Sequence, residues 1–270
     1  MRPNVLGKLA VLGVFFAAAA EAQPPSTAAG PPASPPAWSV VAGYESFWLR
    51  DIAKAGPPVD ASPIAWEGGG PAVVVSYDRG RPGRLHHFEG LFAGAGGFSL
   101  ETPVRSIPGP ADDSEKRFGG RYEYRRYPFR DIWLTGFDIG FGIEGSGDRL
   151  ILARHFQPSI DLDTALTNFG AAGVLAVRLH RWMRVDLLAT WGNGVSIGRA
   201  TTNHYADIDT TQRGWGGGWQ SALQLRAAAR VGPRTSLVVS YFNAGEGRLA
   251  SHDSFTFGRS RFAAGVSYGQ

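Results

Sequence analysis

The chain has 270 residues, with no cysteine, 37 glycines and a formal net charge of +4. The lack of cysteine excludes a disulfide framework and a thiolate metal site, and the small net charge gives no basis for nucleic-acid binding. No continuous apolar run follows the first two dozen residues, which excludes a helical membrane protein. Plentiful glycine and aromatic residues favour an all-β fold, and nothing in the sequence indicates a cofactor.

The N-terminus has the layout of a secretory signal peptide. Arg2 and Lys8 precede an apolar run over Leu9–Ala20, and Ala20-Glu21-Ala22 fits a small-x-small cleavage site. We therefore predict a signal peptide over residues 1–22, cleaved after Ala22. Residues 23–37 contain six prolines and nothing apolar larger than alanine. They are predicted to form a disordered periplasmic tether, because they cannot bury enough surface to fold.

Residues 38–270 alternate between apolar and polar side chains, as expected where successive residues of a strand face opposite ways. The clearest stretch is Ile132–Glu144, whose odd positions form an apolar wall while its even positions carry glycines, Asp138 and Glu144. Ten strands are predicted, over Trp38–Asp51, Val73–Asp78, Leu85–Glu101, Phe118–Arg125, Ile132–Glu144, Asn168–Arg178, Arg184–Trp191, Trp219–Val231, Leu237–Tyr241 and Phe262–Tyr268.

The predicted connections alternate in length. Short turns rich in arginine fall at Arg79–Arg84, Arg126–Asp131, Leu179–Met183 and Val231–Thr235. Long loops rich in acidic residues fall at Ile52–Gly70, Thr102–Arg117, Gly145–Thr167, Val195–Gly218 and Gly245–Ser254. Membrane barrels join their strands in this way, with short periplasmic turns and long outer loops. We predict an all-β, up-and-down antiparallel transmembrane β-barrel of about ten strands.

The third long loop leaves an alternative open. Leu150–Phe156 could be a further strand, which would require another partner and raise the count to about twelve. We interpret it as part of a hairpin that extends beyond the membrane.

On this alternation the chain resembles the outer-membrane β-barrel proteins of Gram-negative bacteria, over Trp38–Tyr268. The resemblance implies a place in the outer membrane, contact with its lipid and lipopolysaccharide, insertion by the barrel-assembly machinery, and a monomer. Such chains usually end in an aromatic residue, whereas here Gly269 and Gln270 follow Tyr268.

The inward face is predicted to carry a network of charges of both signs. Its members are Glu89, Arg121, Glu123, Arg125, Asp138, Glu144, Arg178, Arg184, Asp186, Arg226 and Arg230. Counting from the turn at Arg126–Asp131 predicts a contact between Arg121 and Asp138. About ten strands enclose a lumen well below the 16–18 strands that leave an aqueous channel. A plug of salt bridges is the favoured interpretation, and a narrow pore is the alternative.

Aromatic residues at the ends of the apolar faces are predicted to lie at the membrane interface. They are Trp38, Trp48, Tyr77, Tyr122, Trp133, Trp191, Trp219, Tyr241 and Tyr268.

Motifs for chemistry are few. Gly194-Val195-Ser196-Ile197-Gly198 matches the nucleophile-elbow pattern, but no helix is predicted after it. Ten-stranded omptin proteases carry an acidic pair and a His–Asp couple on outer loops, and a loose likeness appears in Asp112, Asp113, His204, Asp207 and Asp209. His86 and His87 are adjacent on a strand and would face opposite ways, so they cannot share a metal ion.

We therefore predict no catalytic residue, no metal site and no enzymatic activity. The expected function is that of a structural or surface-interaction barrel. The alternatives are a narrow diffusion pore for small solutes and an omptin-like surface protease or lipid-modifying hydrolase.

Overall fold

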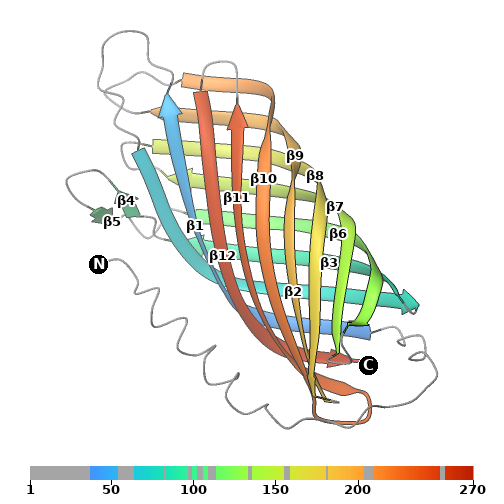
Figure 1. Ribbon diagram of the computed structural model, residues 1–270. Helices are drawn as coiled ribbons and strands as arrows, with labels where there is room; N and C mark the ends of the chain where they lie inside the picture. Colours follow the sequence, from blue (N-terminus) through green and yellow to red (C-terminus); the bar gives the residue numbers. More distant parts are fainter. Residues whose placement is uncertain are drawn as a thin grey trace.

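A computed structural model describes residues 37–53, 64–81, 83–96, 99–101, 106–108, 114–132, 136–154, 159–180, 182–203, 210–249 and 253–269 (Figure 1). The predicted signal peptide and all of the predicted tether except Ala37 lie outside these residues. None of the described segments is a helix long and apolar enough to cross a membrane.

The described residues form strands joined by short turns, in agreement with the all-β composition. The ten long strands are β1 (Ala37–Ala53), β2 (Ile64–Arg81), β3 (Arg84–Gly96), β6 (Ser114–Ile132), β7 (Phe137–Arg154), β8 (Ser159–His180), β9 (Met183–Asn203), β10 (Thr210–Arg230), β11 (Thr235–Leu249) and β12 (Asp253–Tyr268). Two short strands, β4 (Ser99–Glu101) and β5 (Ser106–Pro108), pair with each other beside β2. Figure 1 shows this small hairpin to one side of the long strands.

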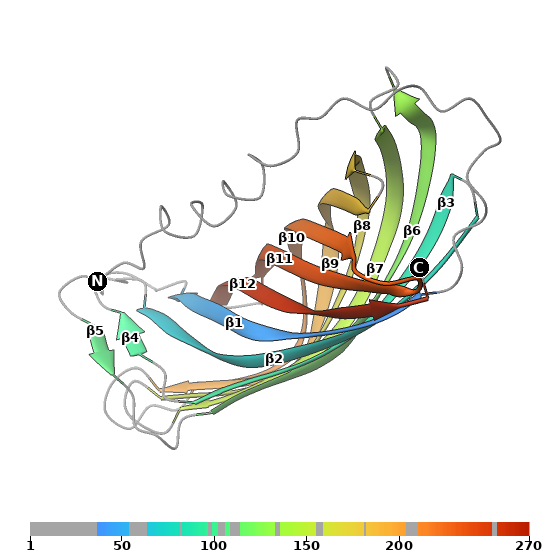
Figure 2. The same cartoon turned by 90° about the horizontal axis from the view of Figure 1, so that it is seen from below.

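The long strands close into one antiparallel barrel. Each pairs with its neighbour along the chain, and β1 pairs with both β2 and β12, so within the described residues the ten-stranded prediction is confirmed. Figure 2 shows the same strands curving round the barrel as seen from below. Closure brings two backbones very close, because a Cβ built on Gly43 of β1 would lie 1.9 Å from the carbonyl oxygen of Phe262.

Several predicted connections are in fact strands. β7 continues to Arg154 and β8 begins at Ser159, so the region between Gly145 and Thr167 extends two barrel strands and adds no further ones. The same holds where β9 runs on to Asn203 and β10 starts at Thr210. Beyond the apolar band the outward face becomes polar, so the alternation that marks a membrane strand fades from the sequence.

The predicted turn at Arg126–Asp131 is also wrong. β6 continues through it to Ile132, with register shifts between Arg126 and Phe129 and between Phe129 and Ile132. Such shifts mark β-bulges. A bulge interrupts the alternation of inward and outward side chains from which strands are predicted. The strand predicted to begin at Ile132 begins at Phe137, just after Gly136, whose φ is +74°. Glycine accepts this conformation without the steric cost of a Cβ.

The strands have apolar outward faces and mixed inward faces. Small apolar clusters pack inside the barrel: Val41, Val74, Val238 and Ala263 form one, and Tyr127, Ala172, Val174, Ala176 and Leu188 form another. Much of the remaining inward face is charged, and we call this charged region a layer and treat it as the candidate site.

Candidate functional site

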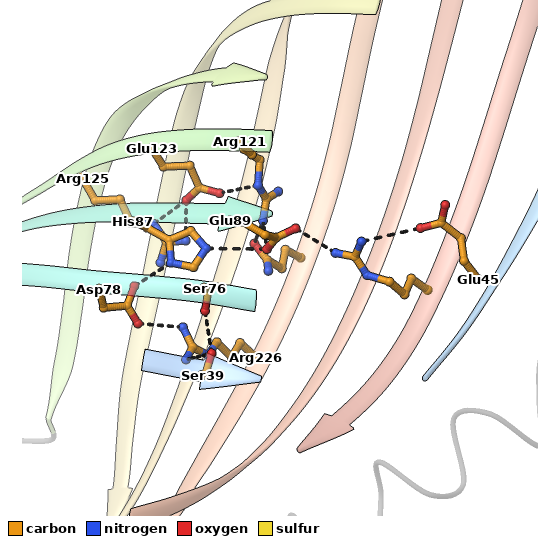
Figure 3. Close-up of polar contacts among 12 residues, drawn as sticks. Ser39, Glu45, Ser76, Asp78, His87, Glu89, Arg121, Glu123, Arg125 and Arg226 are labelled. Carbon is orange, nitrogen blue, oxygen red and sulfur yellow. Dashed lines mark hydrogen bonds and ion pairs between the residues drawn. The ribbon is translucent and has the colours of Figure 1, made fainter. Parts of the chain in front are cut away.

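The side of the charged layer nearer the short turns is built around His87 of β3, which is 2% exposed. Its Nδ1–H donates a hydrogen bond of 2.5 Å to Asp78 Oδ1, while its Nε2 lies 3.6 Å from Glu89 Oε2. The guanidinium of Arg226, from β10 across the lumen, donates to Asp78 Oδ2 at 3.0 Å (Figure 3). The hydroxyl groups of Ser39 and Ser76 lie 2.5 Å apart beside it. This group therefore ties β1, β2 and β3 to β10.

Glu89 links this part of the layer to its centre. Its Oε2 accepts a hydrogen bond of 2.9 Å from Arg121 Nη2, and its Oε1 accepts one of 3.0 Å from Arg261 Nη2. Arg121 also donates to Gln224 at 2.8 Å, and its Nε lies 3.1 Å from Glu123. Figure 3 shows Glu89 between His87 and Arg121. One carboxylate thus joins β3, β6 and β12.

Glu123 of β6 is completely buried and has two cationic partners. Arg125 Nε donates to its Oε2 at 2.7 Å, and Arg121 lies on its other side. Arg121, Glu123 and Arg125 alternate along one strand, so all three point inward from the same face. The strand therefore carries its own neutralising charge between two arginines.

The opposite side of the layer centres on Arg117, which is 2% exposed. Its guanidinium donates to Glu45 Oε1 at 3.0 Å and also hydrogen-bonds Asp148. Arg259 continues the chain of contacts, because its Nη1 lies 3.4 Å from Asp148 and its Nη2 lies 2.9 Å from Glu246 Oε1. These pairs tie β1, β6 and β7 to β11 and β12.

Phe242 of β11 is packed among three of these arginines. The guanidinium carbons of Arg121, Arg259 and Arg261 lie 5.3, 5.4 and 5.1 Å from its ring centroid. Cations at this distance from an aromatic face are attracted by its quadrupole, more strongly when they are desolvated. Phe242 therefore attracts all three arginines, in addition to the carboxylates that they contact.

The cavity at the centre of this layer is small. The cavity lined by Glu89, Arg117, Arg121, Phe242 and Arg259 measures about 20 Å³, enough for roughly one water molecule. An uncompensated buried charge costs several kcal/mol, so the ion pairs are what make this packing tolerable. We call the charged side chains of these paragraphs the lumen network.

The structure places most of the predicted network residues inside the barrel, but not all in the same way. Glu89, Arg121, Glu123, Arg125, Asp138, Glu144, Asp186 and Arg226 face inward and are buried or partly buried. Arg178 and Arg230 are exposed at the turn end, where Arg230 binds the carbonyl of Gly232. The side chain of Arg184 is 40% exposed and pairs with Asp186 at 2.9 Å.

The predicted contact between Arg121 and Asp138 is wrong. Arg121 lies opposite Ser146 across β6 and β7, while Asp138 lies 3.8 Å from Arg184. The error follows from the turn, because the bulged continuation of β6 moves Asp138 several residues further toward the turn end.

Five buried charged residues of the inward face fall where the sequence predicted a loop or where no predicted strand reached. They are Glu115, Arg117, Asp148, Glu246 and Arg259, and with them Arg261 was also missed. The sequence does hold one signal for Arg259 and Arg261. Both lie an even number of residues before Ala263, which faces inward on the strand predicted from Phe262. Extending that alternation backward by four residues would have placed both in the lumen.

The nucleophile-elbow match has no structural basis, since Gly194 and Gly198 both lie within strand β9. Asp112, Asp113, His204, Asp207 and Asp209 lie outside the described residues. His86 and His87 face opposite sides of the wall, with His87 buried inside. Within the described part of the chain, no group of three His, Cys, Asp or Glu side chains could hold a metal ion.

The outer wall carries the predicted interface aromatics. Trp38, Trp48, Tyr77, Tyr122, Trp191, Trp219, Tyr241 and Tyr268 all point away from the lumen, and Trp133 lies outside the described residues. Ten residues separate Trp38 from Trp48 on β1, which corresponds to about 25 Å of height for a strand tilted by about 40°. Beyond that level the wall turns polar, as where exposed Arg149 and Asp163 pair at 2.9 Å.

No family model matches the chain, and no curated protein sequence matches it. Its structure is similar to that of the outer membrane protease OmpT from Escherichia coli, with a TM-score of 0.63 and 10% sequence identity, over 91% of this chain and 99% of that one. OprG from Pseudomonas aeruginosa is a more distant neighbour, with a TM-score of 0.39 and 10% identity over 88% of this chain and 97% of OprG. At these identities the likeness concerns the fold: the chain has the closed antiparallel barrel fold of Gram-negative outer-membrane proteins.

Proposed function

We propose that this chain is an outer-membrane barrel whose lumen is closed by the lumen network, and that it acts as a structural or surface-interaction barrel. The observation that carries the proposal is the burial of Arg117, Arg121 and Arg261, which are at most 9% exposed and line a cavity of about 20 Å³. A diffusion pore needs a continuous water-filled path, and this layer crosses the lumen from β1 to β10.

The outer wall supports the membrane part of the proposal. Val73, Phe92, Ile139 and Val266 are among the large apolar side chains that are more than 40% exposed on it. A continuous exposed apolar surface of this extent marks an interaction surface, and a band of about 25 Å bounded by aromatic residues matches the hydrocarbon layer. Lipid and lipopolysaccharide are therefore the proposed surroundings of a single barrel, inserted by the barrel-assembly machinery.

The free energy needed to break the ion pairs of the lumen network also supports a plug. Glu89 bridges Arg121 and Arg261, and removing one partner of a buried pair typically costs about 3–5 kcal/mol. Solutes could pass only if several such pairs opened together, so the closed state should persist at rest. Function would then lie on the outer surface of the barrel rather than in its interior.

Conductance of the purified barrel in a planar bilayer tests the proposal. We expect no steady current steps from the wild type. A charge-balanced variant that weakens the centre, Glu89→Gln with Arg121→Gln, should give small steps. The matched control is Arg149→Gln with Asp163→Asn, which removes an exposed outer pair and should stay silent. Steady, salt-dependent steps from the wild type would overturn the plug and favour the narrow diffusion pore.

The absence of enzymatic activity is part of the same proposal. The fold that the chain shares with OmpT is no evidence for cleavage at 10% identity. Peptide or lipid hydrolysis by the purified barrel that is lost in both His204→Ala and Asp207→Ala would contradict the proposal and favour a surface hydrolase.

A further inference from the structure

Three exposed arginines on the outer wall, at the turn end, have no partner of opposite charge among the described residues. Arg79 lies on β2, Arg84 on β3 and Arg126 on β6, and no hydrogen bond or ion pair joins their side chains to any described residue. Each alternates with an inward neighbour, so all three face away from the lumen. They are not part of the lumen network.

The strand register brings these positive charges together. Arg84 lies directly opposite Arg126 across β3 and β6, and Arg79 lies directly opposite His86 across β2 and β3. Residues directly opposite on one face have Cβ atoms about 4.5–5.5 Å apart, and like charges in such positions destabilise a sheet. An anion bound between them would remove this repulsion.

His86, which lies beside these arginines, packs against two tyrosines of β6. His86 Nδ1 lies 2.9 Å from the hydroxyl oxygen of Tyr122, and the rings of His86 and Tyr124 have centroids 5.1 Å apart. The three arginines therefore border an aromatic surface on the wall of the barrel.

The level of the group matches a headgroup region. Just above it the outward face carries a row of aromatic rings, in which the centroids of Tyr77 and Phe88 lie 6.2 Å apart and those of Phe88 and Tyr122 lie 4.9 Å apart. Arg79 is two residues beyond Tyr77 and Arg126 is four beyond Tyr122, which is about 7–13 Å along a strand. Aromatic belts sit at the headgroup level of a bilayer, so the guanidinium groups reach the depth of lipid phosphates.

We propose that Arg79, Arg84 and Arg126 bind the phosphate of an anionic phospholipid in the leaflet beside the short turns. The planar guanidinium group binds phosphate oxygens in a bidentate manner, and the apolar wall above offers contact to the acyl chains. This site depends on the outward face of β2, β3 and β6, and does not require the lumen to be closed.

The test is native mass spectrometry of the barrel in a non-ionic detergent titrated with phosphatidylglycerol. Each basic residue near an anionic lipid surface contributes roughly a fivefold change in affinity. We therefore expect Arg84→Gln and Arg126→Gln each to weaken lipid binding about fivefold. Arg234→Gln, which removes an exposed arginine from the β10–β11 turn, should leave binding unchanged. Gel mobility before and after boiling verifies that each variant is folded.

Urea unfolding supplies a second readout, in which wild type and Arg84→Gln are compared without and with phosphatidylglycerol. Without lipid, Arg84→Gln removes one of two facing positive charges, so the variant should resist urea at least as well as the wild type. With phosphatidylglycerol, the wild type should gain more resistance than the variant. Equal losses of lipid binding in Arg84→Gln and Arg234→Gln would overturn the site in favour of general charge attraction. Equal protection by inorganic phosphate alone would overturn the assignment to a lipid.

Discussion

Replacing Arg121 by methionine perturbs the lumen network at its centre. Arg121 contacts Glu89 at 2.9 Å, Glu123 at 3.1 Å and Gln224 at 2.8 Å. The substitution leaves an apolar side chain of similar length against the ring of Phe242. The two carboxylates lose a partner but do not stand alone, since Glu89 keeps Arg261 at 3.0 Å and Glu123 keeps Arg125 at 2.7 Å.

The expected loss of unfolding free energy is about 3 kcal/mol, the lower end of the range for breaking a buried pair, because both carboxylates retain a second cation. Glu89→Gln added to Arg121→Met should cost much less than its separate penalty, with a coupling energy of about 1–3 kcal/mol. Asp138→Asn is the matched control. Asp138 pairs with Arg184 instead, so its penalty should add to that of Arg121→Met within about 0.5 kcal/mol.

The measurement is urea unfolding of barrels refolded into phospholipid vesicles, followed by tryptophan emission and by gel mobility. A constant slope against urea among the variants would show that the change concerns stability rather than compactness. Losses below about 1 kcal/mol that simply add for Arg121 and Glu89 would refute the reasoning, because charges surrounded by water are screened and exposed pairs contribute that little.

Three further predictions concern assembly and location. Gly43→Val should lower stability by at least about 1–3 kcal/mol in the same urea assay, because its Cβ would lie 1.9 Å from Phe262 O, whereas Ala42→Val on the lipid side should change little; equal effects would remove the close-approach argument. Cell fractionation should find the protein in the outer membrane, in a form whose gel mobility changes on boiling, and recovery from the soluble periplasm would contradict this. Antibody on intact cells should reach tags inserted near Asp112 and Asp207 but not near Pro233, and the reverse pattern would invert the orientation.

The architecture could be predicted because every second residue of a membrane-barrel strand faces outward and is apolar. Trp38, Val40 and Ala42 alternate with inward residues as clearly in the sequence as in the structure. Strand ends could not be predicted with the same success, because the wall becomes polar on both faces beyond the apolar band. The extensions of β7 and β8, where Arg149 pairs with Asp163, show this loss of contrast.

The lumen network was only partly predictable for a related reason. The alternation of side chains along β6 identifies Arg121, Glu123 and Arg125 as inward, but it cannot identify their partners across the lumen. Those partners depend on register, and the two bulges in β6 shift it by amounts that no period of two reveals. Arg261 meets Glu89 although 172 residues separate them along the chain. Contacts of this kind follow from closure of the barrel rather than from local sequence.

The central claim is that the middle of the lumen is closed to solvent, and the accessibility of a single thiol there tests it most directly. Because the chain has no cysteine, a thiol introduced by Ala222→Cys would be unique. Ala222 is 9% exposed and packs with Phe242 and Ala244 inside the barrel, while Arg234 is exposed in a turn. In the folded barrel, a water-soluble thiol reagent should label Arg234→Cys rapidly and leave Ala222→Cys unreacted until urea unfolds it. Labelling of both thiols at the same rate in the folded state would contradict the closed lumen.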